Sequence, residues 1–184
     1  MSQAGLAPWR VSETDYPGNG TVAEQLRFML GYAILAPSIH NAQPWLFRIE
    51  EDSVGVCADR SRSLPVTDPD GRELVISCGA ALYHLRLAIR RFGRRDVVTP
   101  FPDFADRNLL ARVRVGETYV PSDNEIRMFD AIPKRHTNRA RFDGRPLPST
   151  LIRTMRDTAA DHGVWFHFAE GADTRLELAK LVAE

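Results

Sequence analysis

Residues 74–93 read LVISCGAALYHLRLAIRRFG, and this stretch decides the fold. Its apolar residues return at helical spacing over about five turns: Leu74, Val75, Cys78, Ala81, Leu82, Leu85, Ala88, Ile89 and Phe92. Basic residues fill the last turn and Gly93 follows as a C-cap, which are both typical of a helix end. The pattern predicts one long helix with a broad apolar face that other elements must cover.

Short apolar segments lie on both sides of this helix. Before it, residues 45–49 (WLFRI) and 53–58 (SVGVCA) are separated by the acidic turn 50–52, which predicts a hairpin. After it, residues 97–101 (VVTPF) and 109–115 (LLARVRV) have the composition of strands. Alternation in the last segment places Arg112 and Arg114 on a solvated face.

Further helices are indicated by their start and stop signals. Thr21 and Glu24 form a capping box before residues 22–35, and Pro37 stops that helix. Ser122 and Glu125 form a second capping box before a short helix that Pro133 ends. Beyond it, the pattern predicts a helix over 149–162, a strand over 164–168 and a helix from 173 to the last residue, 184.

Composition excludes several classes of protein. The chain has 184 residues with 24 basic and 24 acidic side chains, so no net positive field favours nucleic acid. No stretch approaches the ~20 apolar residues of a membrane span, and we expect no membrane partner. The two cysteines form no CxxC motif and lie in apolar segments, which favours buried thiols in a reducing cytoplasm over a disulfide or a metal site.

The first twenty residues are rich in Pro, Gly, Ser and Asn. This composition predicts a flexible N-terminal arm over 1–20. Its possible docking residues are Leu6, Trp9, Val11 and Tyr16.

One polar motif, APSIHNAQPWLF at 36–47, lies between the first helix and the first strand. Its polar side chains are Ser38, His40, Asn41 and Gln43, between two prolines. A capped turn explains them, because short polar side chains satisfy free backbone groups at a helix end. The alternative is a rigid loop that presents polar groups to a ligand with hydroxyls and ring heteroatoms.

A second polar motif, KRHTNRARFD, occupies 134–143. Arginines form forked hydrogen bonds with phosphate, and Thr137 adds a neutral donor. A solvated basic loop is the competing interpretation.

Together the two motifs resemble a known family. Residues 36–45 resemble the APSxxNxQPW loop of the FMN-dependent nitroreductase superfamily, and residues 135–143 resemble its RRSxRxF opening. The inverted order is similar to the Acg-like, dormancy-associated branch, in which two nitroreductase-like halves are fused. Residues 68–73 and 77–88 (SCGAALYHLRLA) resemble the approach to the family's core helix and the helix itself. The resemblance covers the chain after Gly20.

The resemblance implies a nitroreductase-like, mixed α+β fold with a mainly antiparallel sheet flanked by helices. It divides the chain into the arm 1–20, a first half over 21–133 and the beginning of a second half over 134–184. Because chains of the fused type are nearly twice as long, we expect the second half to be truncated here. The resemblance then implies a partner that completes the fold. This partner is either a second copy of the chain in a homodimer or a separate second half.

The resemblance also assigns an FMN site at the seam between two halves. Arg135 would bind the phosphate, with His136 and Thr137 as neighbouring donors, and Arg139 would lie near the pyrimidine edge of the ring. Ser38 and Asn41 match loop positions that contact the ring or the ribityl chain. Gln43 and Trp45 are expected to brace the loop.

The implied activity is hydride transfer from NAD(P)H through flavin to a small acceptor such as a nitro-aromatic or a quinone. No side chain is required as a catalytic acid or base, and no metal is expected. Two alternatives stay open. One is a non-catalytic stress-response protein that sequesters flavin, and the other is an inactive truncated fragment.

Overall fold

The computed structural model describes residues 11–183, which form two compact units that divide between Thr137 and Asn138. The helices and strands of the first unit are α1 (Val22–Ala33), β1 (Trp45–Ile49), β2 (Ser53–Ala58), α2 (Arg72–Arg91), β3 (Arg94–Pro100), β4 (Leu109–Thr118) and α3 (Asp123–Ala131). Four 3-10 helices accompany them: η2 (Glu13–Asp15), η3 (Ile39–Asn41), η4 (Arg60–Arg62) and η5 (Ile132–Lys134). The second unit contains α4 (Ser149–Asp161) and α5 (Ala172–Ala183).

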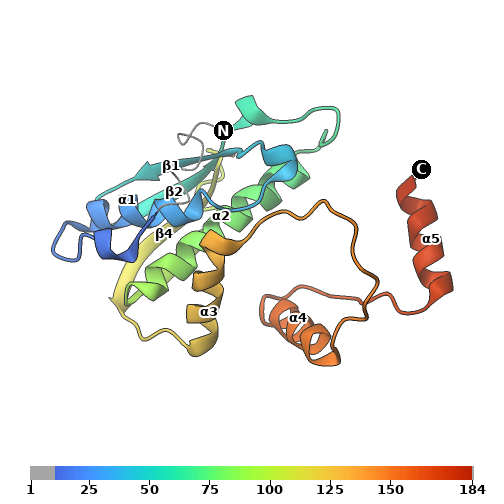
Figure 1. Ribbon diagram of the computed structural model, residues 1–184. Coiled ribbons are helices and arrows are strands. Elements are labelled where there is room, and N and C mark those ends of the chain that lie inside the picture. The colour runs from blue at the N-terminus through green and yellow to red at the C-terminus, as the bar shows by residue number, and fades with distance from the viewer. Residues whose placement is uncertain (1–10, 184) are drawn as a thin grey trace, which may run out of the picture. The chain divides into compact units, whose positions relative to one another are not determined.

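The first unit is built on one four-stranded sheet in the order β1-β2-β4-β3 (Figure 1). All of its pairings are antiparallel, and the hairpin β1-β2 pairs Trp45 with Ala58 and Ile49 with Val54. The expected α+β class with an antiparallel sheet is therefore confirmed, and the bounds of β1 and β2 are those that the sequence predicts.

Helix α2 is the centre of the core. It contacts α1, α3 and all four strands of the sheet (Figure 1). Leu85 and Ile89 of α2 are fully buried and join Val54 and Val113 of the sheet in one apolar cluster. Burial of this broad apolar face gives the main driving force for the fold.

Both predicted capping boxes are present. Thr21 and Glu24 bond reciprocally at the start of α1, and Ser122 and Glu125 do the same at the start of α3. These bonds satisfy amide groups that the first turn of a helix leaves without partners.

The described part of the expected N-terminal arm, 11–20, packs on the helices. The Tyr16 ring stacks on Phe92 with centroids 4.2 Å apart and meets Phe28 edge to face at 5.6 Å. Val11 also packs against the core. Leu6 and Trp9, the other two expected docking residues, lie outside the described residues.

A buried ion-pair cluster ties the end of α2 to β3. The Asp96 side chain is only 2% exposed and accepts from Arg86 Nε at 2.5 Å and from the Nε atom of Arg90. Arg90 Nη1 also donates to Glu125 Oε1 at 2.6 Å, which joins α3 to the same cluster. Burial acts to raise the pKa of Glu125, but hydrogen bonds from Ser122, Arg90 and Tyr119 outweigh it and lower this pKa.

The predicted strand over 164–168 is wrong. These residues form no strand, and Val164 and Trp165 are 59% and 83% exposed. A strand requires a neighbour to satisfy its backbone groups, and the described residues of the second unit contain helices only. No side chain between 138 and 182 is buried.

Among residues 11–183, no helix combines the length and the apolar character needed to cross a bilayer.

Candidate functional site

The loop between α1 and β1 has an unusual backbone. His40, Asn41 and Gln43 all have positive φ angles, of 46°, 57° and 51°. Left-handed backbone is uncommon for residues other than glycine, and it persists only where surrounding contacts hold it. Three such residues within four positions show that this loop is built in one defined shape.

Hydrogen bonds within the loop hold that shape. Ser38 Oγ accepts from the backbone N–H of Gln43 at 2.9 Å, and Gln43 Nε2 donates to Asn41 Oδ1 at 3.4 Å. Gln43 therefore braces the loop, as expected, and Trp45 is buried at the start of β1. Ser38 Oγ uses only its acceptor capacity in this bond, so the hydroxyl proton is available to a ligand.

Side chains of helix α2 hold the loop through hydrogen bonds to its backbone. The buried Ser77 Oγ accepts from the backbone N–H of Ile39 at 3.3 Å and donates to the Glu73 carbonyl at 2.7 Å. The next residue, Cys78, donates from Sγ to the Pro44 carbonyl at 3.1 Å. Both ends of the loop are thus attached to consecutive residues of one helix.

A hollow of about 260 Å³ lies between this loop and α2. It is lined by Pro37, Ser38, Ile39, Glu73, Ile76, Ser77 and Ala80. Ile76 is 53% exposed there, so the hollow combines an accessible apolar wall with the polar side chains of Ser38 and Glu73. Such a mixture suits a flat ligand that carries a few polar atoms. Asn41 does not line this hollow.

Arg135 reaches the base of the same loop. Its Nη2 atom donates to the Leu35 carbonyl at 3.3 Å, across a separation of 100 residues. The structure therefore brings the first arginine of the basic motif to the loop that carries Ser38. The Nε–H group of this arginine is buried and has no hydrogen-bond partner among the described residues.

The other predicted site residues are more exposed. His136 and Thr137 follow Arg135 in the first unit and are exposed, while Arg139 is an exposed residue of the second unit. Ser38, Asn41 and Arg135 are thus the predicted residues that the first unit gathers around its loop.

His84 is a buried neighbour of the site that the sequence analysis did not select. Its Nδ1 atom lies 3.3 Å from the Tyr32 carbonyl near the end of α1. Burial is the main cause that lowers the pKa of His84 to about 4; the hydrogen bond with the Tyr32 carbonyl opposes it, and the positive charge of Arg135 adds to it. His84 is therefore neutral at pH 7. Its only sequence signal is a polar residue on the apolar face of the α2 helix.

The donor set fits a phosphate-bearing flavin better than a metal. The unpaired Nε of Arg135 and the Ser38 hydroxyl are donors, which suit phosphate and hydroxyl oxygens. Within the described residues, no group of three or more His, Cys, Asp or Glu side chains is arranged to hold a metal ion.

Comparison with known proteins finds relatives whose sequences match most of this chain. It is 39% identical over 151 residues to "Putative NAD(P)H nitroreductase Rv3131" of Mycobacterium tuberculosis H37Rv, covering 82% of this chain and 44% of that protein. It is 32% identical over 141 residues to "Putative NAD(P)H nitroreductase acg" of the same organism, covering 75% and 43%. "Uncharacterized protein Rv3127", also from this organism, is 37% identical over 166 residues, covering 85% and 48%.

The chain thus spans about half the length of the curated relatives that it matches. No family model matches it. A nitroreductase family protein from Streptococcus pneumoniae TIGR4 has a TM-score of 0.43, with 17% identity over 69% of this chain and 86% of that one. Two of these relatives have nitroreductase names, and this is the family that the loop and the basic motif resemble. The chain belongs to the nitroreductase family, in the branch that includes Acg.

Proposed function

We propose that this chain is an FMN-binding, NAD(P)H-dependent oxidoreductase that reduces a small acceptor such as a nitro-aromatic or a quinone. The observation that carries the proposal is the bond between Arg135 Nη2 and the Leu35 carbonyl. This bond supports the proposal because it brings a guanidinium, which can bind phosphate, to the loop that carries Ser38. The names of the relatives support NAD(P)H as the reductant.

In this proposal the residues of the chain bind and orient the cofactor. Arg135 binds the FMN phosphate, with His136 and Thr137 as neighbouring donors, and Arg139 lies near the pyrimidine edge of the ring. Ser38 and Asn41 contact the ring or the ribityl chain from the loop. Bound FMN supplies the hydride chemistry, so no side chain acts as acid or base.

We further propose that the chain comprises an arm over 1–20, a first half over 21–133 and the start of a second half over 134–184. The site is then completed by a second copy of the chain or by a separate second half. The two cysteines are free and buried, which is consistent with a protein of the reducing cytoplasm.

Flavin binding tests this proposal directly. FMN is titrated into the purified chain, and its fluorescence is followed before and after removal of free FMN by filtration. We expect Arg135→Ala to weaken binding by about 10- to 100-fold, because hydrogen bonds to charged groups contribute ~1.5–3 kcal/mol. Arg135→Lys should recover part of the affinity, since lysine restores the charge without the fork.

Arg153→Ala provides the matched control, because Arg153 is an exposed arginine of α4. Its FMN affinity should equal that of the original chain. Equal affinity in Arg135→Ala would contradict the proposed phosphate site, provided that circular dichroism shows both variants folded. Oxidation of NADH or NADPH with a nitro-aromatic or a quinone then tests the reaction. Retained flavin without oxidation would favour the flavin-sequestering alternative.

A further inference from the structure

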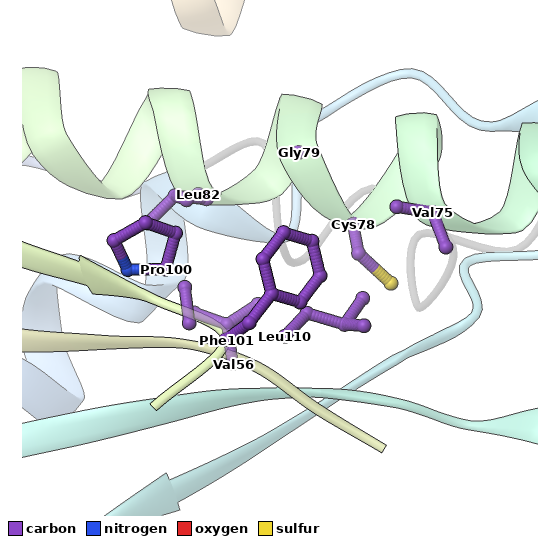
Figure 2. A pocket seen from close by; sticks show the side chains of 9 residues that line it. Val56, Val75, Cys78, Gly79, Leu82, Pro100, Phe101 and Leu110 are labelled. Carbon is purple, nitrogen blue, oxygen red and sulfur yellow. The ribbon is translucent and has the colours of Figure 1, made fainter. Parts of the chain in front are cut away.

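A second cavity, of about 150 Å³, lies between α2 and the sheet (Figure 2). Its floor comes from β2 and β4, its upper wall from α2, and its outer wall from the end of β3. The lining residues are Val56, Val75, Cys78, Gly79, Leu82, Pro100, Phe101, Leu110 and Ala111. We call it the aromatic pocket.

The aromatic pocket contains no charged side chain. The only polar side-chain group in its wall is the Cys78 thiol, which already donates to the Pro44 carbonyl at 3.1 Å. Burial raises the pKa of this thiol to about 11, so it carries no charge at pH 7. A ligand of this pocket therefore finds neither a counter-ion nor a free hydrogen-bonding side chain, and it must be uncharged and apolar.

Phe101 covers the pocket in a strained conformation. Its φ angle is +46°, although it is an aromatic residue and precedes Pro102, which favours extended backbone at this position. The backbone N–H of Phe101 donates to the Leu110 carbonyl at 2.9 Å. This geometry directs the ring toward α2 (Figure 2), yet the residue is still 57% exposed. The backbone at Phe101 is thus strained, and in this conformation it holds a half-exposed ring over the aromatic pocket.

Gly79 leaves that space open from the helix side. A Cβ atom added to Gly79 would meet no atom within 4 Å, and Gly79 is one of the α2 residues that line the pocket (Figure 2). Glycine is unfavourable inside a helix by ~1 kcal/mol relative to alanine, and no close neighbour requires it here.

We propose that the aromatic pocket binds an uncharged molecule with a single aromatic ring. A cavity of about this volume with an apolar lining accepts one benzene-sized ring. The Phe101 ring can pack against another ring edge to face or offset, and a sulfur such as Cys78 Sγ makes favourable contacts with ring edges. These contacts select an aromatic ring over a saturated one of the same size.

This site is separate from the proposed flavin site. The hollow at Ser38 and the aromatic pocket have no lining residue in common, although Cys78 of the pocket also donates to the Pro44 carbonyl at the end of the loop. The inference therefore stands on its own, and its failure would leave the proposed FMN site untouched.

Toluene is the probe for the test. It is titrated into the 184-residue chain with labelled valine and leucine methyl groups, which are followed by NMR. We expect saturable shifts centred on the methyl groups of Val56, Val75, Leu82 and Leu110. Cyclohexane, tested in the same way, should bind at least about threefold more weakly, because a saturated ring cannot make edge-to-face or offset-stacked contacts with the Phe101 ring.

Two substitutions locate the binding. Gly79→Leu fills the pocket from α2 and should abolish the toluene shifts. Phe101→Ala removes the covering ring and should weaken binding by about fivefold. Phe104→Ala is the matched control, because Phe104 is 94% exposed in the same loop and does not line the pocket. Its affinity for toluene should be unchanged.

Three results would overturn the proposal. They are an absence of saturable shifts, retention of toluene binding by folded Gly79→Leu, and equal affinity for cyclohexane. If Gly79→Leu does not fold, the comparison of Phe101→Ala with Phe104→Ala decides, and equal loss or no loss in both variants would refute the site.

Discussion

The Ser77 hydroxyl oxygen lies 3.3 Å from the backbone nitrogen of Ile39, so a buried side chain of α2 holds the loop that carries Ser38. Ser77→Ala removes the hydroxyl oxygen that accepts the hydrogen bond from the Ile39 N–H. We expect amide hydrogen exchange at Ile39 to become about fivefold faster, because one hydrogen bond contributes ~1 kcal/mol. Ser77→Thr keeps the hydroxyl and is the control. Unchanged exchange in Ser77→Ala would show that the loop holds its shape without α2.

The cluster around Asp96 should be important for stability. Asp96→Asn removes the charge that Arg86 and Arg90 share, and the Asp96 side chain is only 2% exposed. Breaking such a pair leaves poorly compensated charge, and we expect a loss of ~2–4 kcal/mol in the free energy of unfolding. Denaturation in urea measures it.

Glu117→Gln is the control for that prediction. Glu117 pairs with Arg95 at 3.1 Å, but the two side chains are 74% and 52% exposed. Exposed pairs contribute little, so this variant should unfold at the same urea concentration as the original chain. Equal losses in both variants would contradict the role given to burial.

His84 should make stability depend on pH. Burial lowers its pKa from 6.5 to about 4, so between these values the unfolded chain binds a proton that the folded chain does not. Stability is therefore full above pH 6.5 and falls as the pH drops toward 4, by roughly 3 kcal/mol in all. Urea midpoints between about pH 5 and 7 measure the slope, and this window lies above the titration of most carboxylates.

His84→Asn should flatten that dependence, because asparagine does not titrate and its amide can still donate to the Tyr32 carbonyl. The same slope in this variant would assign the pH dependence to other groups.

Both cysteines should be inert in the folded chain. Cys57 and Cys78 are each 1% exposed, and burial raises the pKa of both thiols, that of Cys78 to about 11. Because the thiolate is the reactive form, iodoacetamide at about pH 8 should leave the folded chain unmodified while both thiols react in urea. Mass spectrometry counts the added groups. Rapid modification of Cys78 alone would mean that the aromatic pocket opens widely.

Elements with local signals were predictable from the sequence. The capping residues Thr21 and Ser122, the hairpin at 45–58 and the long helix that ends before Gly93 all depend on neighbours in the chain. The strand predicted over 164–168 had a suitable composition but no partner strand, and pairing is a property of the whole fold.

The candidate site was predictable only in its parts. The motifs identified Ser38 and Arg135, but no local pattern indicated that His40 and Gln43 adopt positive φ or that Arg135 donates to Leu35. The Asp96 cluster was also missed, because it depends on how α2 turns into β3. Contacts across long separations depend on the fold, which local patterns do not report.

The contact between Leu35 and Arg135 also sets an order of events during synthesis. The two residues are 100 positions apart, so at about 5–20 residues per second the ribosome adds Arg135 roughly 5–20 s after Leu35. The loop and its supporting helix α2 can form first, since Ser77 and Cys78 precede Arg135 by more than fifty residues. A ligand that requires both motifs can therefore bind only once the basic segment has emerged, and the loop has time to form before that.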